Sequence, residues 1–319
     1  MPLVFVHQGY SPYLELTLRQ ARAADPDAEL VLLGDASNDR FPFVRHVDTA
    51  APPYRAAGAE AERAYEHLST NGRETALRWL QRWFWLRTWL RDGPDRTVFA
   101  LDSDVLLFAP EAELDAAAGG AAFAGCLPND QAGFRWTLGP CVTAWRPGAV
   151  EAFCDFAVRS YAEPDLRARY AEKWAYHRAH GVEGGVVDMT TLYLFAQTLG
   201  PGQFANLAEV RGGAACDQNL TSAENHYPGE YAMDGATKAI HWRRGRPYGR
   251  NLRLGTEVRF RALHLQGHAK RLIPAYYRGP AFAGQTAVRR HLAAHYGARR
   301  LASGALRPAR RLLRRLRGA

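Results

Sequence analysis

Two aspartates stand inside the most apolar stretch of the chain. Residues 98–108 read VFALDSDVLLF, so only Ser103 separates Asp102 from Asp104. Residues i and i+2 of a strand point to one face, and two carboxylates there repel each other unless positive charge lies beside them. Mn²⁺ or Mg²⁺ would supply that charge, because both ions prefer hard oxygen ligands. The alternative is that both aspartates cap a turn or pair with arginines.

A second group of candidate residues lies about 160 residues downstream, in LHLQGHAKRLI at positions 263–273. His264 can offer a neutral imidazole to a metal. Gly267 lets backbone N–H groups approach an anion closely. Lys270, one of only three lysines in the chain, provides a compact charge suited to a phosphate. Taken singly, the histidine fits a hydrogen-bonded core position and the lysine a solvated one.

The ordered pair of motifs, Asp-x-Asp and then His-x-x-Gly-x-x-Lys, resembles bacterial glycosyltransferases of the GT-A fold. The nearest resemblance is to the glycogenin-like and lipopolysaccharide galactosyl- and glucosyltransferase group. It implies that Asp102, Asp104 and His264 bind the metal, and that Gly267 and Lys270 contact the diphosphate of a nucleotide sugar. The residues VHQGY at positions 6–10 are similar to the first strand and loop, against which the nucleotide lies in that group.

Further polar residues are candidates for the nucleotide site. Asp35 follows the second predicted strand and can accept a hydrogen bond from the base or ribose, or can serve as a turn aspartate. Arg82, in a tryptophan-rich helix, can reach the nucleotide or pair with Asp102. The full set of expected donor-binding residues is His7, Gln8, Gly9, Asp35, Arg82, Ser103, Gly267 and Lys270.

The resemblance also implies the reaction. The diphosphate gains negative charge as the sugar leaves, and Lys270 is expected to stabilise it. A retaining enzyme, the more favoured alternative, needs little else, whereas an inverting one needs a carboxylate base for the acceptor hydroxyl. Asp188 is the acceptor-side candidate for that role, although its position also predicts an ordinary helix N-cap. Glu183 and Asp217 are weaker alternatives.

Strand and helix signals alternate along the chain, which predicts an α/β protein with an open, mixed, mainly parallel sheet flanked by helices. In the GT-A (Rossmann-like) arrangement, ligands bind beyond the carboxyl ends of the strands. Ser11 is the expected N-cap of the first helix. The expected strands are 3–7, 29–33, 43–47, 96–101, 139–145 and 262–265, and the expected helices are 12–24, 75–91, 147–160 and 188–199.

The predicted organisation is a catalytic domain over 1–285, with a nucleotide-binding half to about 110 and an acceptor-side half over about 111–285. An Arg-rich helical extension follows over 286–319. Residues 299–319 hold eight arginines and no acid, which leaves +1 of the net charge of +9 for the rest of the chain. The nearly neutral body argues against a nucleic-acid partner. The basic extension suits an anionic membrane surface or an unstructured tail.

No apolar run approaches the roughly 20 residues of a membrane span, and no signal peptide is evident. The expected location is therefore cytoplasmic, with peripheral attachment at the inner face of the membrane. The four cysteines form no Cys-x-x-Cys pair and are expected to be buried, reduced thiols. The predicted function is metal-dependent transfer of a sugar, from a UDP-sugar, to a glycan or lipid-linked acceptor in envelope polysaccharide or glycolipid synthesis. The alternatives are a nucleotidyltransferase-type enzyme, an Asp-x-Asp phosphatase or a non-catalytic nucleotide-sugar-binding protein.

Overall fold

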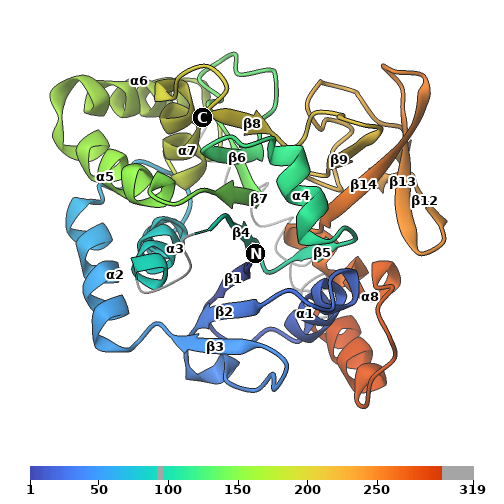
Figure 1. Cartoon of the computed structure of the whole chain (residues 1–319). Coiled ribbons are helices and arrows are strands. Elements are labelled where there is room, and N and C mark those ends of the chain that lie inside the picture. The colour runs from blue at the N-terminus through green and yellow to red at the C-terminus, as the bar shows by residue number, and fades with distance from the viewer. Residues whose placement is uncertain (92–95, 297–319) are drawn as a thin grey trace, which may run out of the picture.

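A computed structural model describes residues 1–91 and 96–296. The first strands of the chain form a parallel ladder (Figure 1). β1 (Leu3–His7) pairs on one side with β2 (Leu30–Gly34) and on the other with β4 (Val98–Leu101), and β3 (Arg45–Asp48) extends the sheet beyond β2. Because all four strands run in the same direction, their carboxyl ends lie along one edge of the sheet.

The sheet continues beyond β4 with β7 (Gly139–Trp145), β6 (Phe123–Cys126) and β8 (Phe204–Asn206). β7 is antiparallel to both of its neighbours, and β6 and β8 are parallel to each other. The resulting order, β3-β2-β1-β4-β7-β6-β8, contains one reversed strand and confirms the predicted mixed, mainly parallel sheet. Strands from both sides of residue 110 share this sheet, so the division into nucleotide and acceptor halves stays a prediction.

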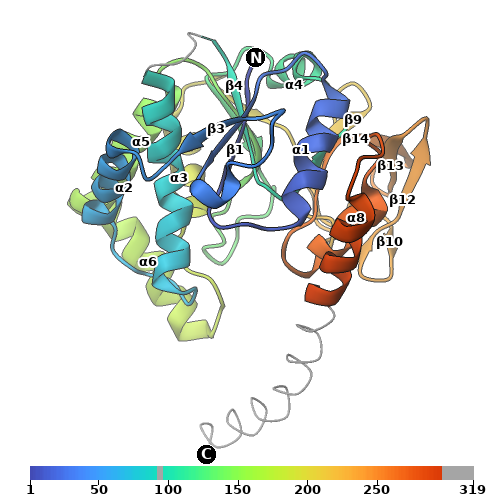
Figure 2. The ribbon, with the colours of Figure 1, turned by 90° about the horizontal axis from the view of Figure 1, so that it is seen from below.

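Helices cover both faces of the sheet, as Figures 1 and 2 show. Alternate residues of each strand feed two separate cores: Leu3 and Phe5 point into one, and Val4 into the other. The first core includes α1 (Tyr13–Ala24) and α4 (Glu111–Ala118). The helices in the second are α2 (Pro52–Ala64), α3 (Arg73–Arg91), α5 (Ala149–Ala162), α6 (Pro164–His180) and α7 (Asp188–Thr198).

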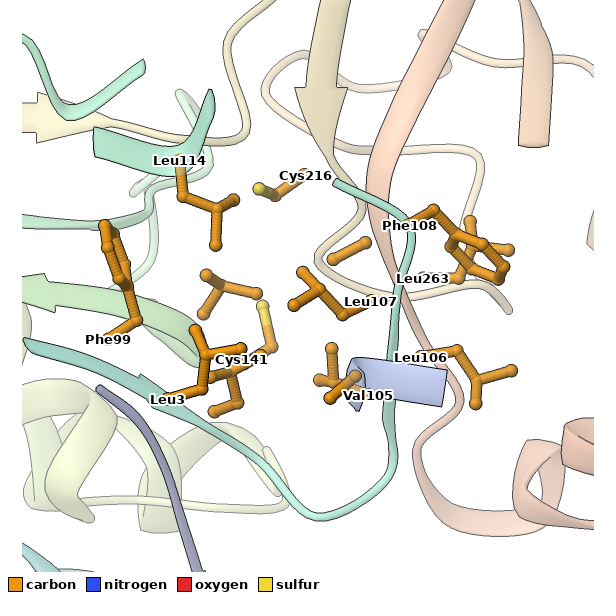
Figure 3. Packing of buried hydrophobic residues seen from close by; sticks show 14 of the residues in the cluster. Leu3, Phe99, Val105, Leu106, Leu107, Phe108, Leu114, Cys141, Cys216 and Leu263 are labelled. Atoms are coloured by element: carbon orange, nitrogen blue, oxygen red, sulfur yellow. The ribbon is translucent and has the colours of Figure 1, made fainter. Parts of the chain in front are cut away.

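A smaller, five-stranded sheet packs against the first core. It runs in the order β12-β13-β14-β5, and β9 pairs with β14 in parallel. Figure 3 shows Val105, Leu106 and Leu107 of β5 beside Leu263 of β14, with Leu3 of β1 in the same cluster. The strands of this part are β5 (Val105–Leu107), β9 (Ala214–Cys216), β12 (Ile240–Arg243), β13 (Arg246–Asn251) and β14 (Thr256–His264), besides a two-stranded ribbon of β10 (Met233–Asp234) and β11 (Thr237–Lys238).

The structure corrects several predicted elements. Residues 98–108 form two strands, β4 and β5, that belong to different sheets, and Asp102 lies in the turn between them. The N-cap of α1 is Pro12, while the Ser11 hydroxyl lies 3.2 Å from His7 Nε2. Asp188 is the first residue of α7, whose N-cap is Val187.

The C-terminal part is described only as far as residue 296. After β14 the chain forms a 3₁₀ turn, η2 (Gly267–Leu272), and the short helix α8 (Ile273–Tyr276), and residues 285–296 are helical. The predicted membrane-binding segment, 299–319, lies outside the described residues. Among the described helices, none combines the length and the apolar character that crossing a membrane requires.

Candidate metal and nucleotide site

The turn that carries the two aspartates lies at the carboxyl end of β4, beside the carboxyl ends of β1 and β2. This edge is where open α/β sheets bind ligands. The Asp102 amide donates to the Cys141 carbonyl of β7 at 3.0 Å, and the Val105 amide donates to the Asp102 carbonyl at 3.1 Å. Both ends of the turn are therefore fixed by backbone hydrogen bonds.

His264 reaches the same turn from the small sheet. β14 pairs with β5 in a register that sets His264 opposite Val105. As a result, His264 Nε2 lies 3.7 Å from Asp102 Oδ2 and 3.3 Å from Asp104 Oδ1. One ligand atom from each of the three residues lies within 4.8 Å of the others, a grouping that can hold a metal ion.

The remaining polar atom of each of these side chains is already engaged. Arg82 donates to Asp102 Oδ1, and Lys270 Nζ lies 2.8 Å from Asp104 Oδ2. His264 Nδ1 lies 2.6 Å from the Gln218 carbonyl, which can only accept, so this nitrogen carries the proton. Two carboxylate oxygens and the Nε2 nitrogen thus converge, and this donor set fits Mn²⁺ or Mg²⁺.

The charges within the cluster shift its titration. Burial opposes ionisation of Asp104, but the charges and hydrogen bonds of His264 and Lys270 hold its pKa well below the usual value. For His264, burial also opposes the charged form, yet Asp104 raises the pKa of this imidazole well above its usual value. In the metal-free protein the protonated ring of His264 therefore supplies positive charge to the cluster. A metal ion would replace this charge, and His264 would release a proton when the ion binds.

Arg82 joins Asp102 to Asp188. Its guanidinium contacts Asp102 Oδ1 through one nitrogen and Asp188 Oδ2 through two others, and Trp83 Nε1 donates to the same Asp188 oxygen at 3.1 Å. The Asp188 side chain is only 2% exposed. Burial raises the pKa of Asp188, and the Arg82 guanidinium opposes this rise. Because Asp188 is buried and paired, it is better suited to positioning Arg82 than to acting as the predicted acceptor-side base.

The β1 end of the site is built on His7. Its Nδ1 lies 2.9 Å from the Ser103 hydroxyl, which also lies 3.4 Å from the hydroxyl of Tyr13. Burial lowers the pKa of His7 to about 4, so the ring is neutral at neutral pH. Ser103, the residue between the two aspartates, is thus held by β1 and α1.

The other β1-end candidates are tied to neighbouring loops. Gln8 Nε2 donates to Thr49 Oγ1 at 2.9 Å. Asp35 accepts hydrogen bonds from the Gly9 amide through one oxygen and from Ser37 through the other. Both Asp35 oxygens are therefore engaged, which supports its interpretation as a turn aspartate that links the loops after β1 and β2.

The candidates after β14 lie in the η2 turn. Gly267 has φ +56°, a conformation that favours glycine, and it opens the turn that returns Lys270 to the metal cluster. Burial opposes the charge on Lys270, but the nearby Asp104 raises the pKa of this amine. Lys270 is thus a fixed cation beside the expected diphosphate position.

The sequence did not indicate the pair that supports His264 from behind. Asp217 accepts from the His264 amide at 3.1 Å and pairs with Lys238 Nζ at 2.6 Å, with both side chains fully buried. Asp217 therefore holds the end of β14 and is not a base open to an acceptor, whereas Glu183 lies exposed before Gly184. The available signal was the scarcity of lysine, since Lys238 is one of three in the chain.

The four cysteines are free and buried, as predicted. The turn of the β12–β13 hairpin is exposed and basic, with Arg243, Arg244 and Arg246 at the surface.

No family model matches the chain, and no curated protein sequence matches it. Solved structures that are similar in part include mouse xyloside xylosyltransferase 1, with 13% identity over 65% of this chain and 84% of that one and a TM-score of 0.44. Galactosyltransferase LgtC, in complex with donor and acceptor sugar analogues, has 16% identity over 61% and 70% of the two chains and a TM-score of 0.36. The glycosyltransferase GlyE of Streptococcus pneumoniae has 13% identity over 65% and 44%, with a TM-score of 0.30. These values are too low to carry a functional argument, which comes instead from the geometry of the site.

Proposed function

We propose that this protein is a metal-dependent glycosyltransferase that moves a hexose from a nucleotide sugar, a UDP-sugar, to a glycan or lipid-linked acceptor. The observation that supports this proposal most is the convergence of Asp102, Asp104 and His264, each with its second polar atom held by the protein. Lys270 beside them supplies the charge that a diphosphate requires. The cluster lies at the sheet edge where a nucleotide would enter.

In this proposal, Asp102 and Asp104 each offer one oxygen to Mn²⁺ or Mg²⁺, and His264 offers Nε2. The bound ion would stabilise the negative charge that develops on the diphosphate as the sugar leaves. Lys270 adds a fixed positive charge at the same place, and Arg82 keeps Asp102 in the orientation that exposes Oδ2. Ser103 and the neutral His7 border the site on its β1 side.

Asp188 and Asp217, two of the candidate carboxylate bases in the described part of the chain, are both buried and paired and are poorly placed to deprotonate an acceptor. In this proposal the enzyme therefore retains the anomeric configuration, and the acceptor attacks from the side of the leaving group. The choice of UDP comes from the sequence resemblance and stays part of the proposal. So do the role in envelope glycan synthesis and the cytoplasmic location, with attachment of 299–319 to the inner face of the membrane.

The decisive experiment is calorimetry of UDP binding with and without Mn²⁺. We expect Mn²⁺ to raise the affinity for UDP at least tenfold, and Asp104→Asn to abolish that gain while the variant stays folded. Asp155→Asn, which changes an exposed aspartate on α5, is the matched control and should behave as wild type. UDP binding that is independent of Mn²⁺ in the wild type would contradict the proposal.

Two further assays separate the alternatives. Hydrolysis of a panel of nucleotide sugars identifies the donor, and an enzyme that transfers sugars should release the nucleoside diphosphate slowly without an acceptor. A nucleotidyltransferase should instead release pyrophosphate from a nucleoside triphosphate. Metal-dependent UDP binding with neither reaction would indicate a non-catalytic nucleotide-sugar-binding protein.

A further inference from the structure

A row of aromatic rings crosses the surface between α6, α7 and the turn before β7. His180 stacks on Tyr176 at 4.0 Å between ring centroids, and Tyr176 lies 5.1 Å from Phe134. Phe134 then lies 4.9 Å from Trp136, which stacks at 6.4 Å on Tyr193. His180 is exposed and the other four rings are partly exposed.

The hydrophobic cores do not explain all of this row. Trp136 and Tyr193 pack against the second core, but among the described residues Phe134 and Tyr176 belong to neither core. Two aromatic side chains are therefore held together at the surface, where each ring is partly exposed.

The backbone that presents the rings is unusual. Gly133, Phe134 and Trp136 have φ of +60°, +54° and +33°, in the left-handed region that side chains other than glycine rarely adopt. A Cβ atom at Gly133 would lie 3.2 Å from the Tyr176 hydroxyl, so glycine allows the turn to approach α6 closely. Such conformations persist only where the surroundings enforce them, and they are concentrated at functional sites.

Buried side chains of α6 enforce this turn. Lys173 Nζ donates to the carbonyls of Arg135 at 2.6 Å and Trp136 at 3.2 Å, and His177 Nε2 lies 3.3 Å from the Phe134 carbonyl. Three consecutive carbonyls are therefore bound by one helix.

A second contact also holds the turn. Arg135 pairs with Glu224 through two of its guanidinium nitrogens, which links the turn to the loop after β9. These contacts fix the backbone that carries Phe134 and Trp136, and a site that is ordered before binding loses less entropy when a ligand binds.

The row is connected to the candidate metal site. The Leu138 amide donates to the Met189 carbonyl at 3.1 Å, and Met189 follows Asp188, which contacts Arg82. Pro140 lines a small pocket together with Arg82 and Asp102. Pro140 is four positions after Trp136 in the chain, so the Cα atoms of these two residues lie at most about 14 Å apart.

We propose that this row is the platform on which neutral sugar rings of a glycan acceptor stack. This inference rests on the proposed transferase function and assigns its acceptor side. Pyranose rings expose C–H groups on one face, which pack on aromatic faces, while their hydroxyls hydrogen-bond at the ring edges. Arg169 lies over Trp136 at 4.6 Å, and Asp130 is exposed in the same turn, so charges of both signs border the row. This balance suits an uncharged glycan.

The test measures binding of maltohexaose, cellohexaose and laminarihexaose to the full chain, by tryptophan fluorescence and saturation-transfer NMR. We expect at least one to bind the wild type, and the double variant Phe134→Ala/Tyr176→Ala to bind it about tenfold more weakly. The double variant Phe134→Tyr/Tyr176→Phe keeps both rings and should bind as wild type.

Tyr248→Ala is the matched control, because Tyr248 is also partly exposed and stacks on a histidine, His241, on the other sheet. It should bind the oligosaccharides as wild type does. The inference is overturned if none of the three binds the wild type, or if the alanine double variant binds as tightly. The affinity for UDP with Mn²⁺ separates the two proposals: if it is normal while glycan binding is absent, only the platform fails. If UDP binding is metal-independent while the alanine substitutions weaken glycan binding, the platform stands and the transferase proposal fails.

Discussion

Replacing Arg82 by methionine should destabilise the protein by leaving a buried charge without its partner. Asp188 Oδ2 receives three hydrogen bonds, two of them from Arg82 and one from Trp83. Its side chain is 2% exposed, so water cannot replace the lost donors. Removing one partner of such a pair costs about 3–5 kcal/mol. We therefore expect Arg82→Met to lower the free energy of unfolding by that amount, a large part of the total of about 5–15 kcal/mol.

A second substitution tests whether the loss of stability comes from the unpaired charge of Asp188. Asp188→Asn removes the charge but leaves an oxygen for the Trp83 N–H, so the double variant Arg82→Met/Asp188→Asn should recover about half of the lost stability. Urea unfolding, followed by tryptophan fluorescence at pH 7.5, measures all four proteins of the cycle. Arg78→Met, an exposed position one turn earlier on α3, is the control and should change stability by less than about 0.5 kcal/mol. A double variant no more stable than Arg82→Met would refute the argument from buried charge.

Three further outcomes follow from other contacts. Gly185→Ala should destabilise strongly in thermal unfolding, because its Cβ would clash with the Leu68 carbonyl and φ is +117°. Lys238→Met should cost about 3–5 kcal/mol in urea unfolding, since it leaves Asp217 buried and unpaired; a loss under 1 kcal/mol would contradict this. His7→Gln tests how the titration of His7 affects stability. Burial lowers the pKa of His7 from 6.5 to about 4, so between these two pH values the imidazole is protonated in the unfolded chain and neutral in the folded one. As the pH is lowered from 6.5 to 4, the free energy of unfolding should therefore decrease more for the wild type than for His7→Gln, by at most about 3 kcal/mol. An equal decrease for the two proteins would contradict this.

The parts of the fold that the sequence predicted have strong local signals. β1 and β7 occupy the expected residues, because continuous apolar runs bounded by turn residues are typical of buried strands. In the small sheet only the end of β14 was predicted, since β9 to β12 have two to four residues each and β10 to β13 carry many polar residues. The polar helix α6 was missed for a similar reason: only Tyr170, Lys173 and His177 of its 17 residues are buried.

The candidate site was also predictable only in part. The spacing of the motifs indicated the residues of the metal cluster, and the structure places Asp102, Asp104 and His264 together. The pairing of Arg82 with Asp102 was one of the predicted alternatives, and the structure shows it. The second partner of Arg82 could not be predicted, because Asp188 is 106 residues away and a helix-start aspartate has an ordinary explanation in capping. The support of Asp217 for His264 likewise depends on a tertiary contact that no local pattern encodes.

The length of the turn between β4 and β5 is constrained by the strands on either side of it. Three residues carry the chain from the large sheet to the small one, and the next residue, Val105, is already paired with His264. One added residue in this turn would reverse the faces of β5, turning its buried side chains away from their present neighbours. It would also move the aspartates relative to the imidazole. We therefore expect the protein not to tolerate insertions or deletions in this turn, whereas the exposed hairpin turn at Arg244 should accept them.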